Sequence, residues 1–178
     1  MSMQAGSGRS YRYYRGGAPL FPFGTGMSYT TFAITLNQEA GAPTPLAVGA
    51  SKVYTVIVTN TGAVAGSASV LVYVNRTLAA PRAPSGGAQL PAMPTIVPEK
   101  DLVLFDACVL PVGGSATLTF TIRPTELGLY NDAGAKAVYA GAYTVEFRAL
   151  GGSSARADLT VATTTVLETI PPVDNRPV

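Results

Sequence analysis

The sequence predicts an all-β protein in which about seven antiparallel strands pack as a two-layered sandwich. Thr and Val are frequent, and the 178 residues include 19 Gly and 14 Pro, a composition typical of many short strands joined by turns. Several segments alternate between apolar and polar residues, whereas no segment keeps a 3.6-residue apolar period over three helical turns. The length fits one domain with extensions.

Alternation is clearest in the segments "ATLTFTI", "YTVEFRA" and "RADLTVA". In the second of these the apolar face carries Tyr143, Val145 and Phe147. Such a pattern predicts antiparallel strands with one buried face. With the less regular β-branched segments, the predicted strands are 28–36, 52–60, 67–75, 101–109, 115–123, 142–150 and 155–162, and a short extra strand at 136–140.

Two segments depart from a minimal sandwich strand. The run "DLVLFDACVL" is almost continuously apolar and predicts a strand covered on both faces. Residues 76–99 contain five Pro and form a long connection, a type of loop that is usually functional or mobile. The predicted organisation is therefore an arm or linker at 1–27, a sandwich at 28–162 that includes the Pro-rich loop, and a C-terminal strand and tail at 163–178.

Seven short strands with Gly-rich turns indicate an immunoglobulin- or fibronectin type III-like sandwich. In "YAGAYTV", Tyr143 enters a late strand just after a corner, which is the pattern of a tyrosine corner. Its hydroxyl is then expected to bond a nearby backbone group, the alternative being a core tyrosine without such a bond. Trp is absent and Cys108 is the single cysteine, which favours the fibronectin type over an antibody domain.

Composition excludes several classes of function. The net charge of +2 is too small for an electrostatic interaction with nucleic acid, and Arg9, Arg12 and Arg15 are predicted to form a solvated entry segment. No run approaches the roughly 20 apolar residues of a membrane span. The first residues lack the apolar region of a signal peptide, so localisation stays open.

Catalytic chemistry finds little support in the residues. Histidine is absent, which excludes Ser-His-Asp and Cys-His catalysis, and neither metal nor cofactor ligands are expected. Paired carboxylates are the remaining hydrolytic possibility, but no pair among the ten acids has a spacing that enforces a catalytic separation. Asn75 lies in an N-R-T sequon and is a possible glycosylation site.

The segment "YRYYRGGAPLFPFGTGMSYTTF" resembles one in family 3 glycoside hydrolases, the β-glucosidases and β-xylosidases, where it leads into a C-terminal fibronectin type III-like domain. The similarity continues through "VYTVIVTNTGAVAGSASVLVYV", "DLVLFDACVLPVGGSATLTFTI" and "AGAYTVEFRALGGSSA", covering about residues 9–162. Departures from the family pattern are Met27, Leu104 and Gly114.

The resemblance implies a non-catalytic accessory domain, because the family's catalytic residues lie in preceding domains that these residues do not contain. It also implies an extracellular or secretory location. No catalytic residue of the family maps onto this chain, which on its own is not expected to be an enzyme.

Two alternatives stay open: a stand-alone structural subunit of a larger complex, and a carbohydrate-binding module that uses Tyr11, Tyr13 and Tyr14. If the chain is an accessory domain, the missing catalytic domains are expected to dock on the arm; if it is an assembly subunit, a protein partner is expected to dock there. In both cases Phe21 and Phe23 are predicted to bury in that partner. The candidate interface consists of Tyr11, Tyr13, Tyr14, Leu20, Phe21 and Phe23.

Overall fold

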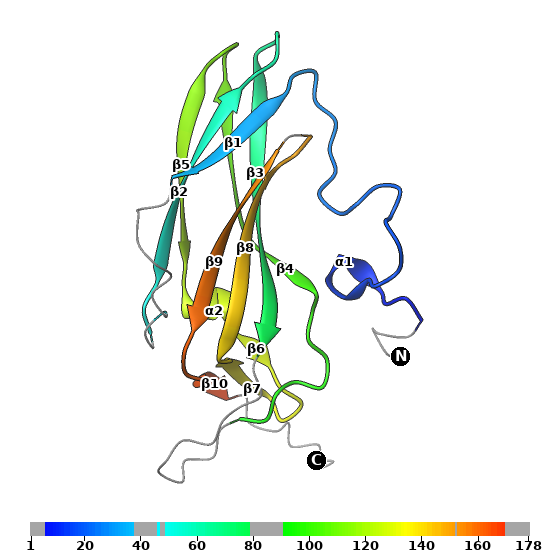
Figure 1. The fold of residues 1–178 in the computed structure, drawn as a ribbon, viewed down its shortest axis with the longest axis vertical. Coiled ribbons are helices and arrows are strands. Elements are labelled where there is room, and N and C mark those ends of the chain that lie inside the picture. Colours follow the sequence, from blue (N-terminus) through cyan, green and yellow to red (C-terminus); the bar gives the residue numbers. More distant parts are fainter. Residues whose placement is uncertain (1–5, 38–45, 47–48, 79–90, 152, 170–178) are drawn as a thin grey trace, which may run out of the picture.

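Two antiparallel sheets pack face to face, and a third, smaller sheet closes one end (Figure 1). The computed structural model describes residues 6–37, 46, 49–78, 91–151 and 153–169. The first sheet has the order β1-β2-β5, the second β4-β3-β8-β9, and the small one β10-β7-β6. This three-plus-four arrangement is the predicted immunoglobulin/fibronectin type III-like sandwich.

The elements have the following bounds. The first sheet contains β1 (Phe32–Asn37), β2 (Lys52–Asn60) and β5 (Ser115–Ile122). The second contains β3 (Gly66–Leu78), β4 (Lys100–Leu110), β8 (Gly141–Ala149) and β9 (Ser154–Val161). The small sheet contains β6 (Leu129–Tyr130), β7 (Ala135–Val138) and β10 (Thr165–Thr169), and two single-turn helices are α1 (Ser10–Tyr13) and α2 (Pro124–Leu127).

The main core lies between the two large sheets and follows from the alternation in the sequence. Val56 and Val58 of β2 are fully buried, and they meet inward residues of β3 and β8 such as Val72 and Phe147. Thr side chains occupy many of the outward positions between them. β-branched side chains suit this half-buried, pleated surface, which explains why Val and Thr dominate the composition.

The turn "NTG" after β2 is held by a buried asparagine. Asn60 accepts a hydrogen bond from the Thr30 hydroxyl (2.6 Å) and from the Gly62 N–H (3.1 Å). Its amide group donates to the carbonyls of Val64 (2.8 Å) and Leu110 (3.3 Å). One side chain therefore connects the start of β1, the β2–β3 turn and the end of β4.

Tyr143 forms the hydrogen bond expected at a tyrosine corner. Its hydroxyl donates to the Tyr139 carbonyl at 2.5 Å, and the ring is buried at the start of β8. Burial raises the pKa of Tyr143 to about 12, although Arg76 and this hydrogen bond act in the opposite direction.

Two expectations about the strands need correction. β1 begins at Phe32 rather than at residue 28, because Thr30 and Thr31 bond to the Asn60–Gly62 turn instead of extending the strand. β4 is an edge strand and is not covered on both faces, since Phe105 is 74% and Val109 79% exposed. A continuous apolar run does not distinguish a central strand from an edge strand that has apolar residues on its outer face.

The segments around the sandwich are only partly described. Residues 79–90 of the Pro-rich loop and 170–178 of the tail lie outside the described residues. The end of the loop packs through Met93 and Val97 against a small second core of Leu129, Ala137 and Tyr139. The predicted C-terminal strand corresponds to β10, which pairs with β7.

Candidate interface on the N-terminal arm

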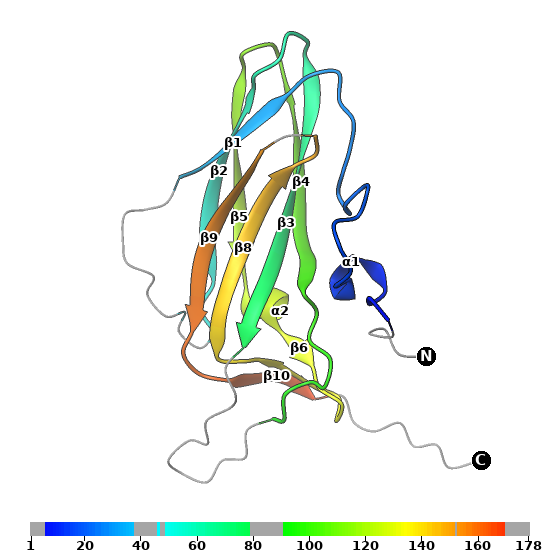
Figure 2. The same cartoon turned by 45° about the vertical axis from the view of Figure 1, so that its right-hand side comes forward.

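The N-terminal arm (residues 1–27, described from residue 6) lies along the outside of the four-stranded sheet. In Figures 1 and 2 it passes from α1, beside β4, along the sheet to the start of β1. The arm therefore returns onto its own sandwich before the first strand begins.

An aromatic cluster holds the arm to the sheet. The Tyr11 and Phe23 rings stack with centroids 4.0 Å apart and planes at 10°, and both meet the Tyr73 ring edge-on at 6.3 and 6.4 Å. Tyr73 belongs to β3 and is completely buried. On the outer face of the sheet, such burial is possible because the arm covers the ring. The Lys100 ammonium lies 4.6 Å from the centre of the same ring, a cation–π contact.

Backbone hydrogen bonds fix the arm to the start of β4. The Glu99 N–H donates to the Arg12 carbonyl at 2.6 Å, and the Leu102 N–H donates to the Tyr11 hydroxyl at 3.1 Å. These bonds satisfy edge groups that would otherwise be open to pairing.

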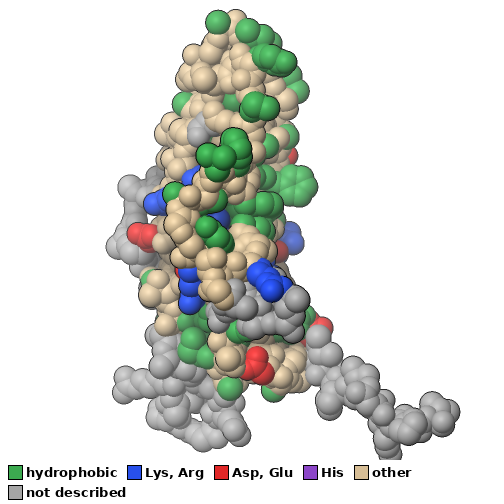
Figure 3. Space-filling model, turned by 90° about the vertical axis from the view of Figure 1, so that its right-hand side faces the viewer, with side chains coloured by type: hydrophobic (Ala, Val, Ile, Leu, Met, Phe, Trp, Pro, Cys, Tyr) green, Lys and Arg blue, Asp and Glu red, His purple; other side chains and the backbone are tan. Residues whose placement is uncertain are grey.

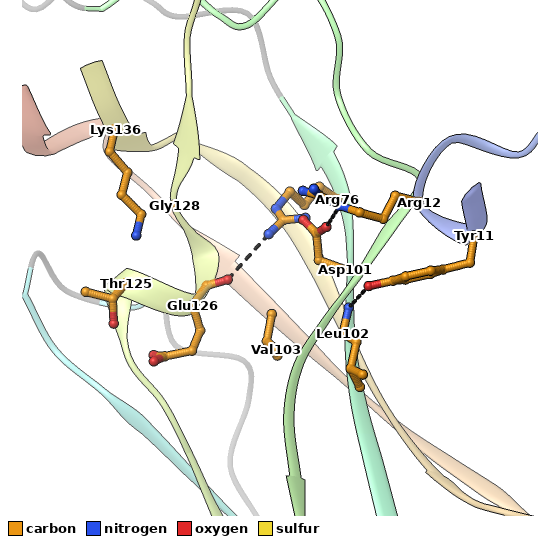
Figure 4. Close-up of a pocket in the computed structure, with 10 residues that line it drawn as sticks. All are labelled: Tyr11, Arg12, Arg76, Asp101, Leu102, Val103, Thr125, Glu126, Gly128 and Lys136. Carbon is orange, nitrogen blue, oxygen red and sulfur yellow. Dashed lines mark hydrogen bonds and ion pairs between the residues drawn. The ribbon is translucent and has the colours of Figure 1, made fainter. Parts of the chain in front are cut away.

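A buried carboxylate connects the arm to the interior of the sheet (Figure 4). Asp101 on β4 pairs with Arg12 of the arm and, at 2.5 Å, with Arg76 of β3, whose side chain is 1% exposed. Arg76 also donates to the carbonyls of Glu126 and Leu127, both at 3.4 Å. Burial alone lowers the pKa of Arg12, but the hydrogen bond and charge of Asp101 outweigh it and raise the pKa. Arg12 therefore keeps 42% of its side chain exposed, as a solvated segment predicts, but it also pairs with Asp101, which the sequence did not indicate.

A turn at Pro22–Thr25 places Phe23 in the cluster. The Thr25 N–H donates to the Pro22 carbonyl at 3.0 Å, and Gly24 has φ +81°. A side chain at Gly24 would be strained by that φ and would overlap the Tyr73 hydroxyl, so the close approach of backbone to ring requires glycine here.

The predicted interface residues divide into two groups. Tyr11 and Phe23 pack on the sheet, although Phe23 stays 46% exposed, whereas Leu20 is 88% and Phe21 76% exposed. At the junction with β1, Met27 and Tyr29 are also fully exposed. Figure 3 shows hydrophobic side chains standing out over this face of the molecule.

The three tyrosines do not share one open platform. Tyr11 has a face covered by Phe23, and the Arg12 guanidinium lies 5.5 Å from the centre of the Tyr13 ring. Tyr14 is 39% exposed. This arrangement gives no support to the carbohydrate-binding alternative.

Beside α1, an open groove of about 470 Å³ separates the arm from the α2 region (Figure 4). Lys136, Thr125 and Glu126 line one side of it, opposite Arg12 and Tyr11. The carboxylates along it are already bonded, because Asp101 pairs with two arginines and Glu126 accepts from the Arg123 N–H at 2.7 Å. Within the described ranges, no three His, Cys, Asp or Glu side chains are grouped so that they could hold a metal ion.

Asn75, the possible glycosylation site, lies in β3 between Lys100 of β4 and Thr144 of β8. Its Oδ1 atom is buried and has no hydrogen-bond partner among the described residues. Glycosylation of Asn75 stays a prediction.

Arg76, Asp101 and Tyr73 are contact residues that sequence reasoning missed. Arg12 and Asp101 are 89 positions apart, and Arg76 and Asp101 are 25 apart. The one local feature of the sequence that could have indicated these contacts is Asp101 itself, because it is a charged residue at the start of an apolar strand.

No family model matches. The chain is 33% identical over 165 residues to a β-xylosidase from Formosa agariphila, covering 90% of the chain and 20% of that protein. A thermostable β-glucosidase B from Acetivibrio thermocellus is 32% identical over 126 residues, which are 68% of the chain and 14% of that protein. The chain is a relative of family 3 glycoside hydrolases.

It resembles their C-terminal fibronectin type III-like domain, and it spans about a fifth or less of these relatives' length. The fold agrees: a β-glucosidase structure from Listeria innocua, in complex with gluconolactone, superimposes with a TM-score of 0.65 at 21% identity. That match covers 90% of this chain and 21% of the other. Among the described residues, no helix is long and apolar enough to span a bilayer.

Proposed function

We propose that the chain is a non-catalytic accessory domain of the family 3 glycoside hydrolase type, which packs on neighbouring catalytic domains and stabilises them. The observation that carries this proposal is the division of the arm. Its inner side is docked on the sheet by Tyr11, Arg12 and Phe23, while its outer side presents Leu20 and Phe21 to solvent.

The exposed side of the arm is suited to a protein partner. Burying a large apolar side chain contributes about 1.5–3 kcal/mol, so Leu20 and Phe21 alone would contribute substantially to docking. Their backbone is held by docked residues on both sides, which reduces the entropy lost on binding. Charged residues make up only 12% of the chain, and a surface with few charges favours protein contacts.

The state of the carboxylates supports a non-catalytic role. Glycoside hydrolysis needs two carboxyl groups free to act as acid and as base or nucleophile. Here Asp101 and Glu126 are engaged as described, and Glu146 is buried beside Arg148 (3.2 Å) and Arg156 (3.5 Å). In this proposal, the chemistry belongs to the parts of the relatives that the chain does not match.

A chimaeric enzyme tests the proposal. The 178-residue chain replaces the matching fifth of the Formosa agariphila β-xylosidase, and hydrolysis of an aryl β-xyloside is measured with the temperature of half-inactivation. We expect an active chimaera that is inactivated at a lower temperature when Leu20→Ser and Phe21→Ser are introduced together. Val64→Ser, at an exposed valine away from the arm, is the matched control and should change nothing.

A second experiment uses the isolated chain. It should show no turnover of aryl β-glucosides or β-xylosides, and turnover at enzymatic rates would contradict a non-catalytic role. A stand-alone assembly subunit would use the same exposed residues. The mass of the native polypeptide separates the two readings, because an accessory domain belongs to a polypeptide far above 18.3 kDa.

A further inference from the structure

The groove between the arm and α2 is lined by more cationic side chains than carboxylates. Arg12, Arg76 and Lys136 line it, and they are opposed by Asp101 and Glu126. Asp101 is shared between the two arginines, and the Glu126 carboxylate accepts a backbone N–H of its own turn at 2.7 Å. The lining therefore has one positive charge in excess, and both of its carboxylates are already engaged.

Lys136 on β7 directs its ammonium group into this groove. A Cβ atom at Gly128 would lie 3.1 Å from the Lys136 Cε atom, so the lysine stem lies directly against the glycine. Figure 4 shows the side chain extending toward Thr125. Glu168 lies opposite Lys136 on β10, but its carboxylate accepts from the Tyr130 hydroxyl at 3.3 Å. The ammonium group has no hydrogen bond or ion pair with a described residue, and its one contact is the Tyr130 ring at 5.5 Å.

On the opposite side of the groove, the arm also presents hydrogen-bond donors. The Nε atom of Arg12 pairs with Asp101, which fixes the guanidinium, while its two Nη groups have no hydrogen-bond partner among the described residues. The Tyr11 hydroxyl accepts from the Leu102 N–H at 3.1 Å, and its own proton has no acceptor there. The Thr125 hydroxyl is likewise unbonded within the described ranges. A ligand for this groove must therefore supply acceptors and negative charge.

We propose that the groove binds a small organic acid with two oxyanion groups, one held by the Lys136 ammonium and the other by the Nη groups of Arg12. Ammonium and guanidinium groups form strong charge-assisted hydrogen bonds with carboxylates and phosphates. The hydroxyls of Thr125 and Tyr11 donate to the remaining oxygens. The volume of about 470 Å³ lies within the range of about 300–1,000 Å³ that is usual for small-molecule sites.

Two acids of different length test the proposal on the 178-residue chain. Binding of succinate and of acetate is measured by calorimetry and by backbone amide shifts, at constant ionic strength so that screening does not change. Succinate should bind about tenfold more tightly than acetate, because only succinate reaches both cations. Amide shifts are expected at Thr125, Gly128 and Lys136. This inference does not rest on the proposed accessory role, which uses Leu20 and Phe21.

A pair of lysine substitutions assigns the binding to the groove. Lys136→Gln should weaken succinate binding about tenfold, to the level of acetate, since one oxyanion loses its charged partner. Lys52→Gln removes the same charge from an exposed position at the start of β2, and it is the matched control that should leave the affinity unchanged.

A third variant tests the position of the ammonium group without removing its charge. Gly128 has φ −67°, which alanine also adopts, so Gly128→Ala should displace the Lys136 stem and weaken succinate binding while the fold is retained. Circular dichroism checks the fold of each variant. Absence of succinate binding, equal affinities for succinate and acetate, or unchanged affinity in Lys136→Gln would overturn the proposal.

Discussion

The sandwich core and the N-terminal arm both contain aromatic side chains, but different interactions hold them. In the core, Phe147 is fully buried, with its ring 5.4 Å from that of Tyr54 and 5.7 Å from that of Phe120. In the arm, Phe23 stacks on Tyr11 and remains half exposed. The core is closed by apolar contact from two sheets, whereas the arm is attached by one ring stack, a few hydrogen bonds and the pairing of Arg12 with Asp101.

This difference indicates two levels of stability in one chain. The arm lies on the outer face of a sheet whose own core does not include it, so it can open without unfolding the sandwich. The arm is therefore expected to open at a lower free energy than the sandwich. Each prediction below separates these two levels.

The largest effect is expected in the core. Phe147→Ala removes a fully buried ring that contacts both sheets and should lower the free energy of unfolding by about 4 kcal/mol. Urea denaturation followed by circular dichroism measures this. A loss below about 1 kcal/mol would mean that the site collapses around the missing ring and that the core is not closely packed there.

The second-largest loss in the free energy of unfolding is expected at the junction between core and arm. Asp101→Asn leaves the buried Arg76 guanidinium without a counter-charge, and we expect a loss of about 3 kcal/mol together with release of the arm. Glu99→Gln is the matched control on the neighbouring contact, since its partner Arg15 is exposed, and it should cost no more than about 0.5 kcal/mol. Equal losses in the two variants would mean that Asp101 is not a structural centre.

The contrast also explains what the sequence could predict. Alternation along β5, β8 and β9 located those strands to within a residue or so, because one face of each must be buried. Alternation could not show that β4 lies at the edge of its sheet. Which strands lie beside a given strand depends on how the whole chain is connected, and the pattern within one strand does not contain that information. The Tyr143 pattern worked because its hydrogen-bond partner is four residues away.

The candidate interface was predictable only in outline. An excess of aromatic residues among prolines and glycines marks a segment that must be covered by something. Which rings turn inward depends on Tyr73, Arg76 and Asp101, residues distant in sequence. No periodic pattern in a single sequence reports such contacts.

Alkaline pH should weaken the core through two buried tyrosines. Burial raises the pKa of both Tyr54 and Tyr143 to about 12, against about 10 in an unfolded chain. Because the folded state favours the protonated form, this contribution to stability is complete below about pH 10 and is lost as pH rises through about 12. Urea midpoints should therefore fall over this range.

A substitution at Tyr143 measures the share of the alkaline decline that comes from this ring. Tyr143→Phe lacks the ionisable group and should flatten the alkaline decline, at a cost of about 1 kcal/mol near neutral pH for the lost hydrogen bond. Tyr29→Phe, at an exposed tyrosine, should leave the decline as it is. An unchanged decline in Tyr143→Phe would assign it to other groups.

The same substitution as in the core should cost far less in the arm. Phe23→Ala removes one ring stack and a half-exposed surface, and we expect a loss of about 1 kcal/mol in global stability. Amide hydrogen exchange should rise at Leu102, whose N–H bonds to Tyr11, but not in β8. Faster exchange throughout β8 would show that arm and core unfold together.

The smallest effect is expected at the outer ion pair of the arm. Arg15 pairs with Glu99 while their side chains are 60% and 46% exposed, so Arg15→Ala should change stability by less than about 0.5 kcal/mol, and less still in high salt. Arg12→Ala removes the partly buried partner of Asp101, and its larger loss should persist in salt. Denaturation of both variants in low and high salt compares them directly. If the two arginines contributed equally, attachment of the arm would depend on surface charge alone, and the buried Arg76–Asp101 pair would not explain where it docks.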